Sequence, residues 1–215
     1  AQANGGHRTA LLAKVTLADV RQGLNALAAE MPNFSSAVDV LAAELALAMS
    51  GPMSEFRVTP IVLYGAPGIG KTRFASQLSA ILNTGFEKVA MGAASGSFEL
   101  SGVSQGWGTS RPGRIAKILA HREDASPVVL LDELDKANGD HRFPVLPILL
   151  DLLETDSARH FRDECLELEL DASRIIFIGT ANDPDLIPDP LRSRVRMVEL
   201  QVPTVEQRLQ IALRM

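Results

Sequence analysis

The sequence predicts an α/β fold in which a parallel five-stranded sheet is flanked by helices and preceded by a helical segment. From Pro60 onwards, short apolar runs alternate with helical patterns. Several runs are continuously apolar, as expected of parallel strands that helices cover on both faces. In addition, a glycine-rich segment joins the first run to a helical pattern, an arrangement that predicts a phosphate-binding loop.

Two helices are predicted before the sheet. The first begins at Thr16, a capping residue with Asp19 three positions later, and the second runs from Ser35 or Ser36 to Ser50. The five predicted strands are Ile61 to Tyr64, Phe86 to Ala90, Val128 to Leu131, Ile175 to Gly179 and Met197 to Val202. The predicted parts are therefore a helical segment (1–51), an α/β core (52–203) and the start of a further helix (204–215).

The phosphate-loop pattern G-x-x-x-x-G-K-[ST] is fitted by Gly65, Ala66, Pro67, Gly68, Ile69, Gly70, Lys71 and Thr72. Glycines allow successive backbone N–H groups to converge on phosphate oxygens, and the following helix directs its positive end at the same charge. Lys71 is then predicted to reach the β- and γ-phosphates and Thr72 to bind Mg2+. The alternative is a Gly/Pro turn with a coincidental Lys-Thr pair, which the flanking strand and helix patterns disfavour.

The third strand ends in two adjacent carboxylates, Asp132 and Glu133. Because neighbouring side chains on an extended strand point to opposite sides, we expect Asp132 to bind Mg2+ directly or through water. Glu133 then faces the space beyond the γ-phosphate, where it can polarise an attacking water as general base. A pair of solvated loop residues is the alternative, and the upstream phosphate loop favours the catalytic interpretation.

Polar residues also follow the fourth strand and precede the fifth. Asn182 is predicted to hold the lytic water or to sense the γ-phosphate, and the alternative is a turn-capping Asn. Arg192, Arg194 and Arg196 occupy alternate positions before the last strand. A guanidinium group suits phosphate because it stays charged and can bind two oxygens, although surface arginines more often form weak ion pairs.

Composition disfavours several classes of function. The net charge of -5 argues against a broad nucleic-acid or membrane-binding surface. The single cysteine, Cys165, excludes an internal disulfide and is predicted to pack in a strand, and the four histidines lack zinc-ligand spacing. We find no charged-then-apolar leader, and Glu44 interrupts the most apolar stretch. These features predict a cytoplasmic protein without membrane contact.

Together the motifs resemble the AAA+ ATPase module of Lon-type proteases over about residues 30 to 202. Four segments carry the resemblance: Gly65 to Thr72, Leu130 to Lys136, Gly179 to Asn182, and Ile187 to Leu191 with Arg194. It implies the P-loop NTPase (AAA+) core, ATP and Mg2+, and a homo-oligomeric ring, usually a hexamer, with the nucleotide between subunits. It also implies the sensor 1 role for Asn182 and the arginine-finger role, towards the neighbour's ATP, for Arg194, with Arg192 as second candidate.

The segment Gly106 to Arg114 resembles the Lon segment in which an aromatic and an aliphatic residue of the central-pore loop precede Pro-Gly-Arg. Trp107 is thereby implied to grip a polypeptide as ATP is consumed. Gly108 departs from the family, which has a bulky residue there, and this departure leaves a local packing role for Trp107 as the alternative.

The resulting prediction is Mg–ATP hydrolysis that drives protein unfolding or translocation, as the motor of a protease or as a remodeller. The alternative is a nucleic-acid-remodelling or loader ATPase. Between Gly92 and Ser110 there is no Lys or Arg, which is poor chemistry for gripping a phosphate backbone. A non-hydrolysing switch is disfavoured by the presence of Glu133 and Arg194. We expect no peptidase site in this chain. The resemblance also implies that residues 204–215 begin a helical lid, with the sensor 2 arginine beyond Met215.

Overall fold

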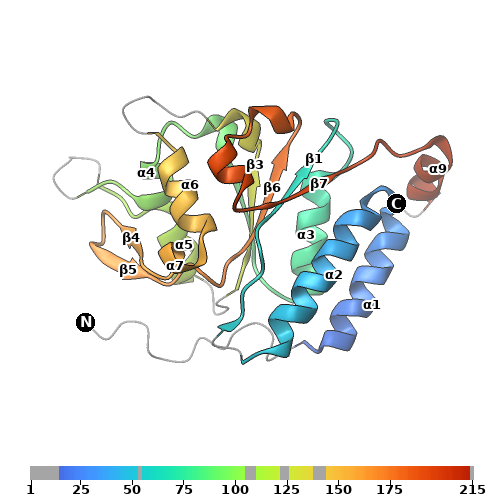
Figure 1. Cartoon of the computed structure of the whole chain (residues 1–215), viewed down its shortest axis with the longest axis horizontal. Helices are drawn as coiled ribbons and strands as arrows, with labels where there is room; N and C mark the ends of the chain where they lie inside the picture. The colour runs from blue at the N-terminus through green and yellow to red at the C-terminus, as the bar shows by residue number, and fades with distance from the viewer. Residues whose placement is uncertain (1–14, 53–54, 105–109, 122–125, 138–143, 214–215) are drawn as a thin grey trace.

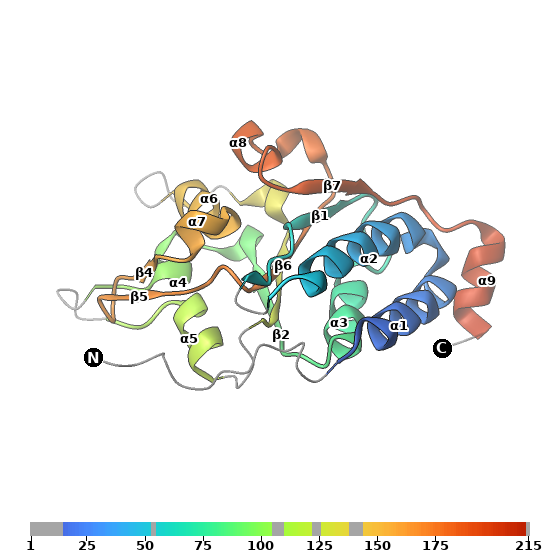
Figure 2. The same ribbon diagram turned by 60° about the horizontal axis from the view of Figure 1, so that its bottom comes forward.

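A single parallel sheet organises the structure, a computed structural model that describes residues 15–52, 55–104, 110–121, 126–137 and 144–213. Its strand order is β2-β3-β6-β1-β7, which confirms the predicted class. The strands are β1 (Ile61–Tyr64), β2 (Phe86–Ala90), β3 (Val128–Asp132), β6 (Ile176–Ala181) and β7 (Arg196–Glu199). Helices lie on both sides of this sheet (Figure 1), and β2 and β7 form its opposite edges (Figure 2).

The strand ends differ from the predicted ones where pairing decides them. β6 continues to Ala181 because that residue pairs with Tyr64 of β1. The last predicted strand was placed at Met197 to Val202, but β7 ends at Glu199. Among the described residues its one partner strand is β1, which stops at Tyr64 where the chain turns into the predicted phosphate loop. Beyond the final bond from Leu200 N–H to Tyr64 O, the part of the chain that the structure describes offers no further strand with which this segment could pair.

The helices fall into two groups, one on each face of the sheet (Figure 1), whereas α8 lies near β7 and α9 lies beyond the ends of α1 and α2 (Figure 2). The first group is α1 (Leu17–Glu30), α2 (Ser35–Ser50) and α3 (Lys71–Ile81), with the 3-10 turn η2 (Pro32–Phe34). The second group is α4 (Phe98–Ser101), α5 (Arg114–His121), α6 (Leu146–Leu153) and α7 (Thr155–Ala158). The remaining helical elements are η4 (Met91–Ala93), η5 (Leu134–Lys136), η6 (Pro184–Leu186), α8 (Asp189–Arg192) and α9 (Val205–Leu213).

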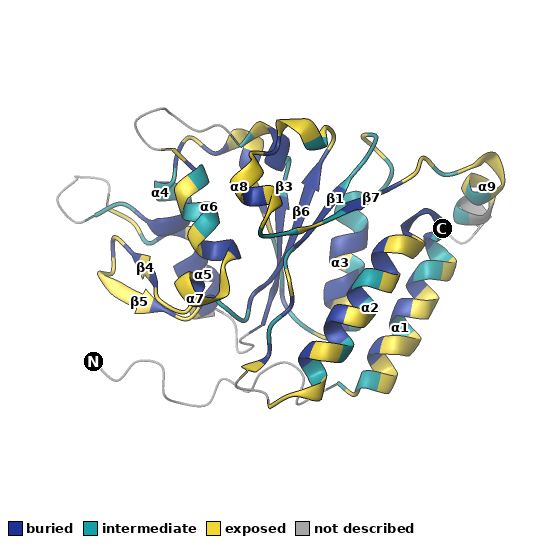
Figure 3. Ribbon diagram, viewed as in Figure 1, coloured by how far each residue is buried: buried dark blue, intermediate teal, exposed yellow. Residues whose placement is uncertain are grey.

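Alternate residues of the strands build two hydrophobic cores. Leu63 and Leu130 pack in the cluster that also holds the apolar residues of α1, α2 and α3. Val62 and Val129, one position earlier in each strand, pack in the cluster on the opposite face. Phe34, the last residue of η2 between α1 and α2, stacks on Phe74 of α3 with ring centroids 4.7 Å apart. The N-terminal helices therefore share one core with the sheet, whose three central strands β3, β6 and β1 are mostly buried (Figure 3).

A small antiparallel hairpin, β4 (Phe161–Asp163) with β5 (Leu168–Leu170), was not predicted. Each strand has only three residues, too few for a period-2 pattern to stand out. Cys165, expected in a strand, lies in the turn between β4 and β5 and is buried there. The prediction was wrong because the backbone reverses direction after Asp163, whose carboxylate caps the turn.

Within the described residues, every helix is too short or too polar to cross a bilayer.

Candidate active site

The predicted phosphate loop runs from the end of β1 to the start of α3. Gly70, from which α3 begins, has a φ of 105°, in the left-handed region that favours glycine. A Cβ at Gly70 would also lie 3.0 Å from Cε of Met31. Both the backbone conformation and the close approach to Met31 therefore favour glycine at this position. The first backbone N–H groups of α3 have no partner within the helix and are available to an anion.

A cavity of ≈ 280 Å³ opens between this loop and the carboxyl ends of β3 and β6, where open α/β sheets bind their ligands. Its described lining is Pro67, Gly68, Gly70, Lys71, Thr72, Arg73, Asp132, Glu133, Thr180, Ala181 and Asn182. Three motifs predicted separately thus meet around one space. Of the other loop residues, Gly65 and Ala66 supply carbonyl groups to Lys71, and Ile69 packs against the hydrophobic core.

Lys71, the first residue of α3, directs its side chain back onto the loop. Its Nζ donates to Gly65 O at 2.5 Å, to Ala66 O at 3.2 Å and to Asn182 Oδ1 at 2.9 Å. Burial lowers the pKa of Lys71, and the charges of Asp135 and Asp132 oppose that shift. The ammonium group is thereby held between the loop and the end of β6.

Asp132 ends β3 inside this cavity. Its Oδ1 accepts from Thr180 Oγ1 at 2.5 Å, and its Oδ2 lies 2.6 Å from Lys88 Nζ. Burial acts to raise the pKa of Asp132, but the hydrogen bonds from Lys88 and Thr180 and the lysine charges outweigh burial. The pKa therefore lies below its ordinary value. The side chain is an ionised carboxylate at neutral pH, as a metal ligand must be.

Glu133 lies outside β3, so the prediction that strand alternation sets the direction of its side chain is wrong. β3 ends at Asp132, and Glu133 adopts a φ of 61° and a ψ of 52°, the left-handed region. A non-glycine residue in this conformation is uncommon and occurs often at functional sites. The backbone N–H of Glu133 donates to Thr180 Oγ1 at 3.0 Å, and its carboxylate pairs with Lys136 Nζ at 2.7 Å. The backbone turn, rather than strand alternation, separates Glu133 from Asp132.

Asn182 is positioned by a carboxylate that the sequence did not single out. Asp135 Oδ2 accepts from the backbone N–H of Asn182 at 3.0 Å and from that of Asp183 at 3.2 Å. Asp135 is buried in η5, directly after Glu133 and Leu134. This contact leaves the Asn182 side chain to face Lys71 and the cavity.

The three alternate arginines have different surroundings. Arg194 Nε pairs with Glu154 at 3.0 Å and its Nη1 donates to Pro190 O at 3.0 Å. Arg196 pairs at 2.8 Å with Glu44, a buried residue of α2, and so ties β7 to the N-terminal helices. Arg192 lies 3.9 Å from Asp185. Among the described residues that line the cavity, neither Arg192 nor Arg194 is present.

Several residues of the site escaped the sequence-based reasoning. Lys88 lies outside every predicted motif, and Thr180 and Asp135 lie within motif segments but were given no role. The three residues contact Asp132, Glu133 or the backbone of Asn182. One feature of the sequence could have identified Lys88. It is a charged residue two positions after Phe86 in β2, so it lies on the face of the sheet that α3 covers. Trp107, the predicted polypeptide contact, lies outside the described residues.

The donor set suits a magnesium ion shared with phosphate. Mg2+ is usually held by one or two carboxylates or hydroxyls together with substrate phosphates. Thr72 and Asp132 line the same cavity, and the Asp132 carboxylate already attracts the cation of Lys88. In the described part of the chain, this site included, no group of three or more His, Cys, Asp and Glu residues could hold a metal.

Thr180→Val is expected to lower the affinity for Mg2+ about 10- to 100-fold, the usual cost of losing a partner of a metal ligand. The valine removes the hydroxyl that bonds both Asp132 and the Glu133 backbone. The measurement is ATP hydrolysis across a Mg2+ titration. Thr180→Ser, which keeps the hydroxyl, is the matched control and should stay near wild type. Equal Mg2+ requirements for the two variants would contradict the assignment.

Comparison with known proteins gives a family and a set of relatives. Residues 61–203 match the model described as "ATPase family associated with various cellular activities (AAA)". The chain is 37% identical over 151 residues to a Lon protease of Campylobacter jejuni, covering 70% of this chain and 19% of that protein. It is also 37% identical over 164 residues to a Lon protease of Amoebophilus asiaticus, covering 76% and 19%. The chain thus spans about a fifth of the length of these curated relatives.

A solved structure of a Thermotoga maritima RuvB mutant shares the fold. The TM-score is 0.50 at 23% sequence identity, and the match covers 78% of this chain and 47% of that one.

Proposed function

Because this chain belongs to the ATPase family associated with various cellular activities (AAA), we propose that it hydrolyses ATP with Mg2+ in the cavity described above. One observation carries the proposal. The phosphate loop, the Asp132 and Glu133 pair and Asn182 line a single cavity although they come from three distant parts of the sequence. The family supports ATPase activity, and the residue roles that follow are our assignment.

In the proposed mechanism, Lys71 and the N-terminal amides of α3 hold the phosphates, and Thr72 and Asp132 hold Mg2+. When bound, the metal ion neutralises charge on the phosphate oxygens. Asn182 orients the lytic water, and Glu133 accepts its proton as the oxygen bonds to the γ-phosphorus. The bond between that phosphorus and the bridging oxygen breaks, and ADP leaves with the bridging oxygen. Glu133 must part from Lys136 to accept the proton, because the ammonium group lies 2.7 Å from its carboxylate and occupies an oxygen that the water would use.

We further propose a homo-oligomeric ring, with a hexamer as the expected size. Arg194 would stabilise the transition-state charge on the neighbouring subunit's ATP, with Arg192 as second candidate. The position of both residues outside the described cavity lining supports action on a neighbour. To engage that ATP, Arg194 must exchange its partner Glu154, with which it forms a partly exposed pair.

Polypeptide unfolding or translocation is proposed from the relatives, which are named as Lon proteases. The matches cover the ATPase region of much longer proteins, so they support a motor role and leave the peptidase outside the proposal. Trp107 is assigned as the polypeptide contact. We also propose that α9 begins a helical lid, as the exposed side chains of Val205 and Leu209 support, and that the protein acts in the cytoplasm.

The test is phosphate release by the full-length protein with Mg2+, with and without an unfolded protein such as casein. We expect hydrolysis that requires Mg2+ and rises with casein, and a Trp107→Ala variant that keeps basal hydrolysis but loses the stimulation. An absence of hydrolysis would overturn the enzymatic proposal. Hydrolysis that neither casein nor Trp107→Ala alters would overturn the motor role, and salt-sensitive stimulation by DNA would favour the nucleic-acid alternative.

A further inference from the structure

A fully buried carboxylate, Asp163, lies at the end of β4, away from the nucleotide cavity. Its relative exposure is 0%. Asp163 Oδ1 accepts from the backbone N–H groups of Cys165 at 3.0 Å and Leu166 at 2.9 Å, and Oδ2 accepts from Gly113 N–H at 2.8 Å. A buried carboxylate is costly unless it is paired or hydrogen-bonded, and here backbone amides satisfy both oxygens.

The two oxygens of Asp163 serve different segments. Oδ1 caps the turn of its own hairpin, whereas Oδ2 binds Gly113, which lies 50 residues earlier. Gly113 closely follows Arg111, which pairs with Val103 in an isolated antiparallel bridge. The stem, defined as residues 101–103 and 111–113, brackets the stretch that contains Trp107.

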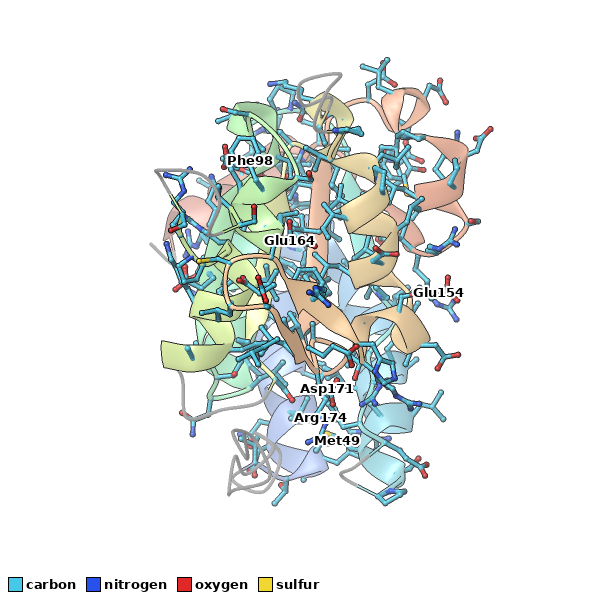
Figure 4. The ribbon with its side chains drawn as sticks, turned by 90° about the vertical axis from the view of Figure 1, so that its left-hand side faces the viewer. Met49, Phe98, Glu154, Glu164, Asp171 and Arg174 are labelled. Atoms are coloured by element: carbon cyan, nitrogen blue, oxygen red, sulfur yellow. The ribbon has the colours of Figure 1, made fainter. Side chains whose placement is uncertain are left out.

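A second bond joins the same two segments. Glu164 N–H, next to Asp163, donates to Ser101 O in the stem at 2.7 Å. In Figure 4 the hairpin residue Glu164 faces the viewer below Phe98, the first residue of α4, which leads into the stem. The hairpin and the stem are thus connected from both sides of the stem.

The contact between the hairpin and the stem leaves no room for a side chain at Gly102 or Gly113. A Cβ at Gly113 would collide with Leu100 O, and a Cβ at Gly102 would lie 3.1 Å from Asp163 Oδ1. The carboxylate therefore touches stem backbone directly, which holds the distance between hairpin and stem within narrow limits.

The stem also leads to the nucleotide cavity through the next residue. Arg114, directly after Gly113, donates from Nη2 to Lys88 O at 3.1 Å. The Lys88 ammonium pairs with Asp132, the assigned metal ligand. Two consecutive residues thus make both connections. Gly113 binds the hairpin through Asp163, and Arg114 binds β2 beside the proposed metal site.

We propose that Asp163 is a positioning residue that sets the stem of the Trp107 stretch against the β4–β5 hairpin, so that polypeptide contact and ATP hydrolysis stay coupled. The inference rests on the proposed motor function. It assigns Asp163 no contact with nucleotide or polypeptide, because its three donors are backbone amides within the chain.

Asp163→Asn separates this role from the capping of the hairpin turn. The asparagine oxygen can still accept from Cys165 and Leu166, but its NH2 group then faces the Gly113 N–H, where two donors oppose each other. Asp163→Ala removes both functions. Asp171→Asn is the matched control, since Asp171 caps the exposed turn after β5 through Ser173 and does not touch the stem.

Two measurements test the proposal, one for the position of the stem and one for the coupling of polypeptide contact to ATP hydrolysis. Trp107 is the single tryptophan of these 215 residues, so the tryptophan fluorescence of this chain, measured without casein, reports Trp107. The second readout is the ratio of casein-stimulated to basal ATP hydrolysis. Asp163→Asn is expected to shift the fluorescence and to lower the ratio about 2- to 30-fold, the range for losing one coupling contact, with basal hydrolysis retained. Asp171→Asn should match wild type in both readouts.

An Asp163→Asn protein with wild-type fluorescence and ratio would overturn the proposal, because capping the turn would then be the whole role. If wild type itself is not stimulated by casein, the motor function fails, and fluorescence alone decides whether Asp163 positions the stem. Hydrogen exchange on wild type needs no variant. Gly113 N–H should exchange as slowly as the Cys165 and Leu166 amides, and exchange at the rate of an exposed loop would also overturn the proposal.

Discussion

Glu133→Gln is expected to lower ATP turnover about 100- to 10,000-fold, the contribution of a general base, while ATP binding persists. Glutamine has nearly the same shape and keeps an oxygen towards Lys136 Nζ, which lies 2.7 Å from the Glu133 carboxylate. It cannot accept the proton of the lytic water. The phosphate loop is unaltered, so the Kd for ATP should stay near the wild-type value.

The measurement pairs phosphate release with equilibrium binding of a fluorescent ATP analogue. Glu164→Gln is the matched control, because it removes one exposed carboxylate from the hairpin and lies outside the described cavity lining. Its turnover should equal that of wild type. Hydrolysis by Glu133→Gln within a few-fold of wild type would show that another group accepts the proton.

Arg194→Ala is expected to reduce turnover about a thousandfold or more, the usual cost of losing an arginine finger. The decisive measurement is a mixture. When Arg194→Ala subunits assemble with Glu133→Gln subunits, some interfaces join an intact Glu133 to an intact Arg194 of the neighbour. Hydrolysis by the mixture should therefore exceed the sum of the two variants assayed alone.

The control for the mixture is Arg196→Ala, which removes an arginine that pairs with Glu44 of its own chain. This change is expected to lower stability and to leave turnover per folded subunit near wild type. Demonstrated co-assembly of the Arg194→Ala and Glu133→Gln subunits without restored hydrolysis would exclude action of Arg194 across the interface.

Local motifs made much of the nucleotide site predictable. A strand, a glycine-rich turn and a helix start are consecutive in sequence, so the pattern from Gly65 to Thr72 already contains the geometry that a phosphate needs. Asp132 and Asn182 were found by the same reasoning, since each follows an apolar strand and parallel strands end at one edge. The structure places both in the cavity with Lys71.

Contacts between distant segments could not be predicted in this way. Thr180 hydrogen-bonds both the Asp132 carboxylate and the Glu133 backbone. The separation of the Asp132 and Glu133 carboxylates was wrongly attributed to strand alternation, because a backbone turn at Glu133 produces it. The hairpin was missed, and with it the bond from Gly113 to Asp163.

The sequence by itself determined the α/β class, the strand that carries each motif and the position of the predicted phosphate loop. These follow from periodicity and from side chains a few positions apart, where the backbone dictates distance. Only the tertiary structure decided which polar groups partner Asp132, where β7 ends, and that a buried carboxylate ties the stem to the hairpin. The sequence around a carboxylate does not specify its hydrogen-bond partner. That partner depends on how deeply the carboxylate is buried and on which donors the fold brings near it.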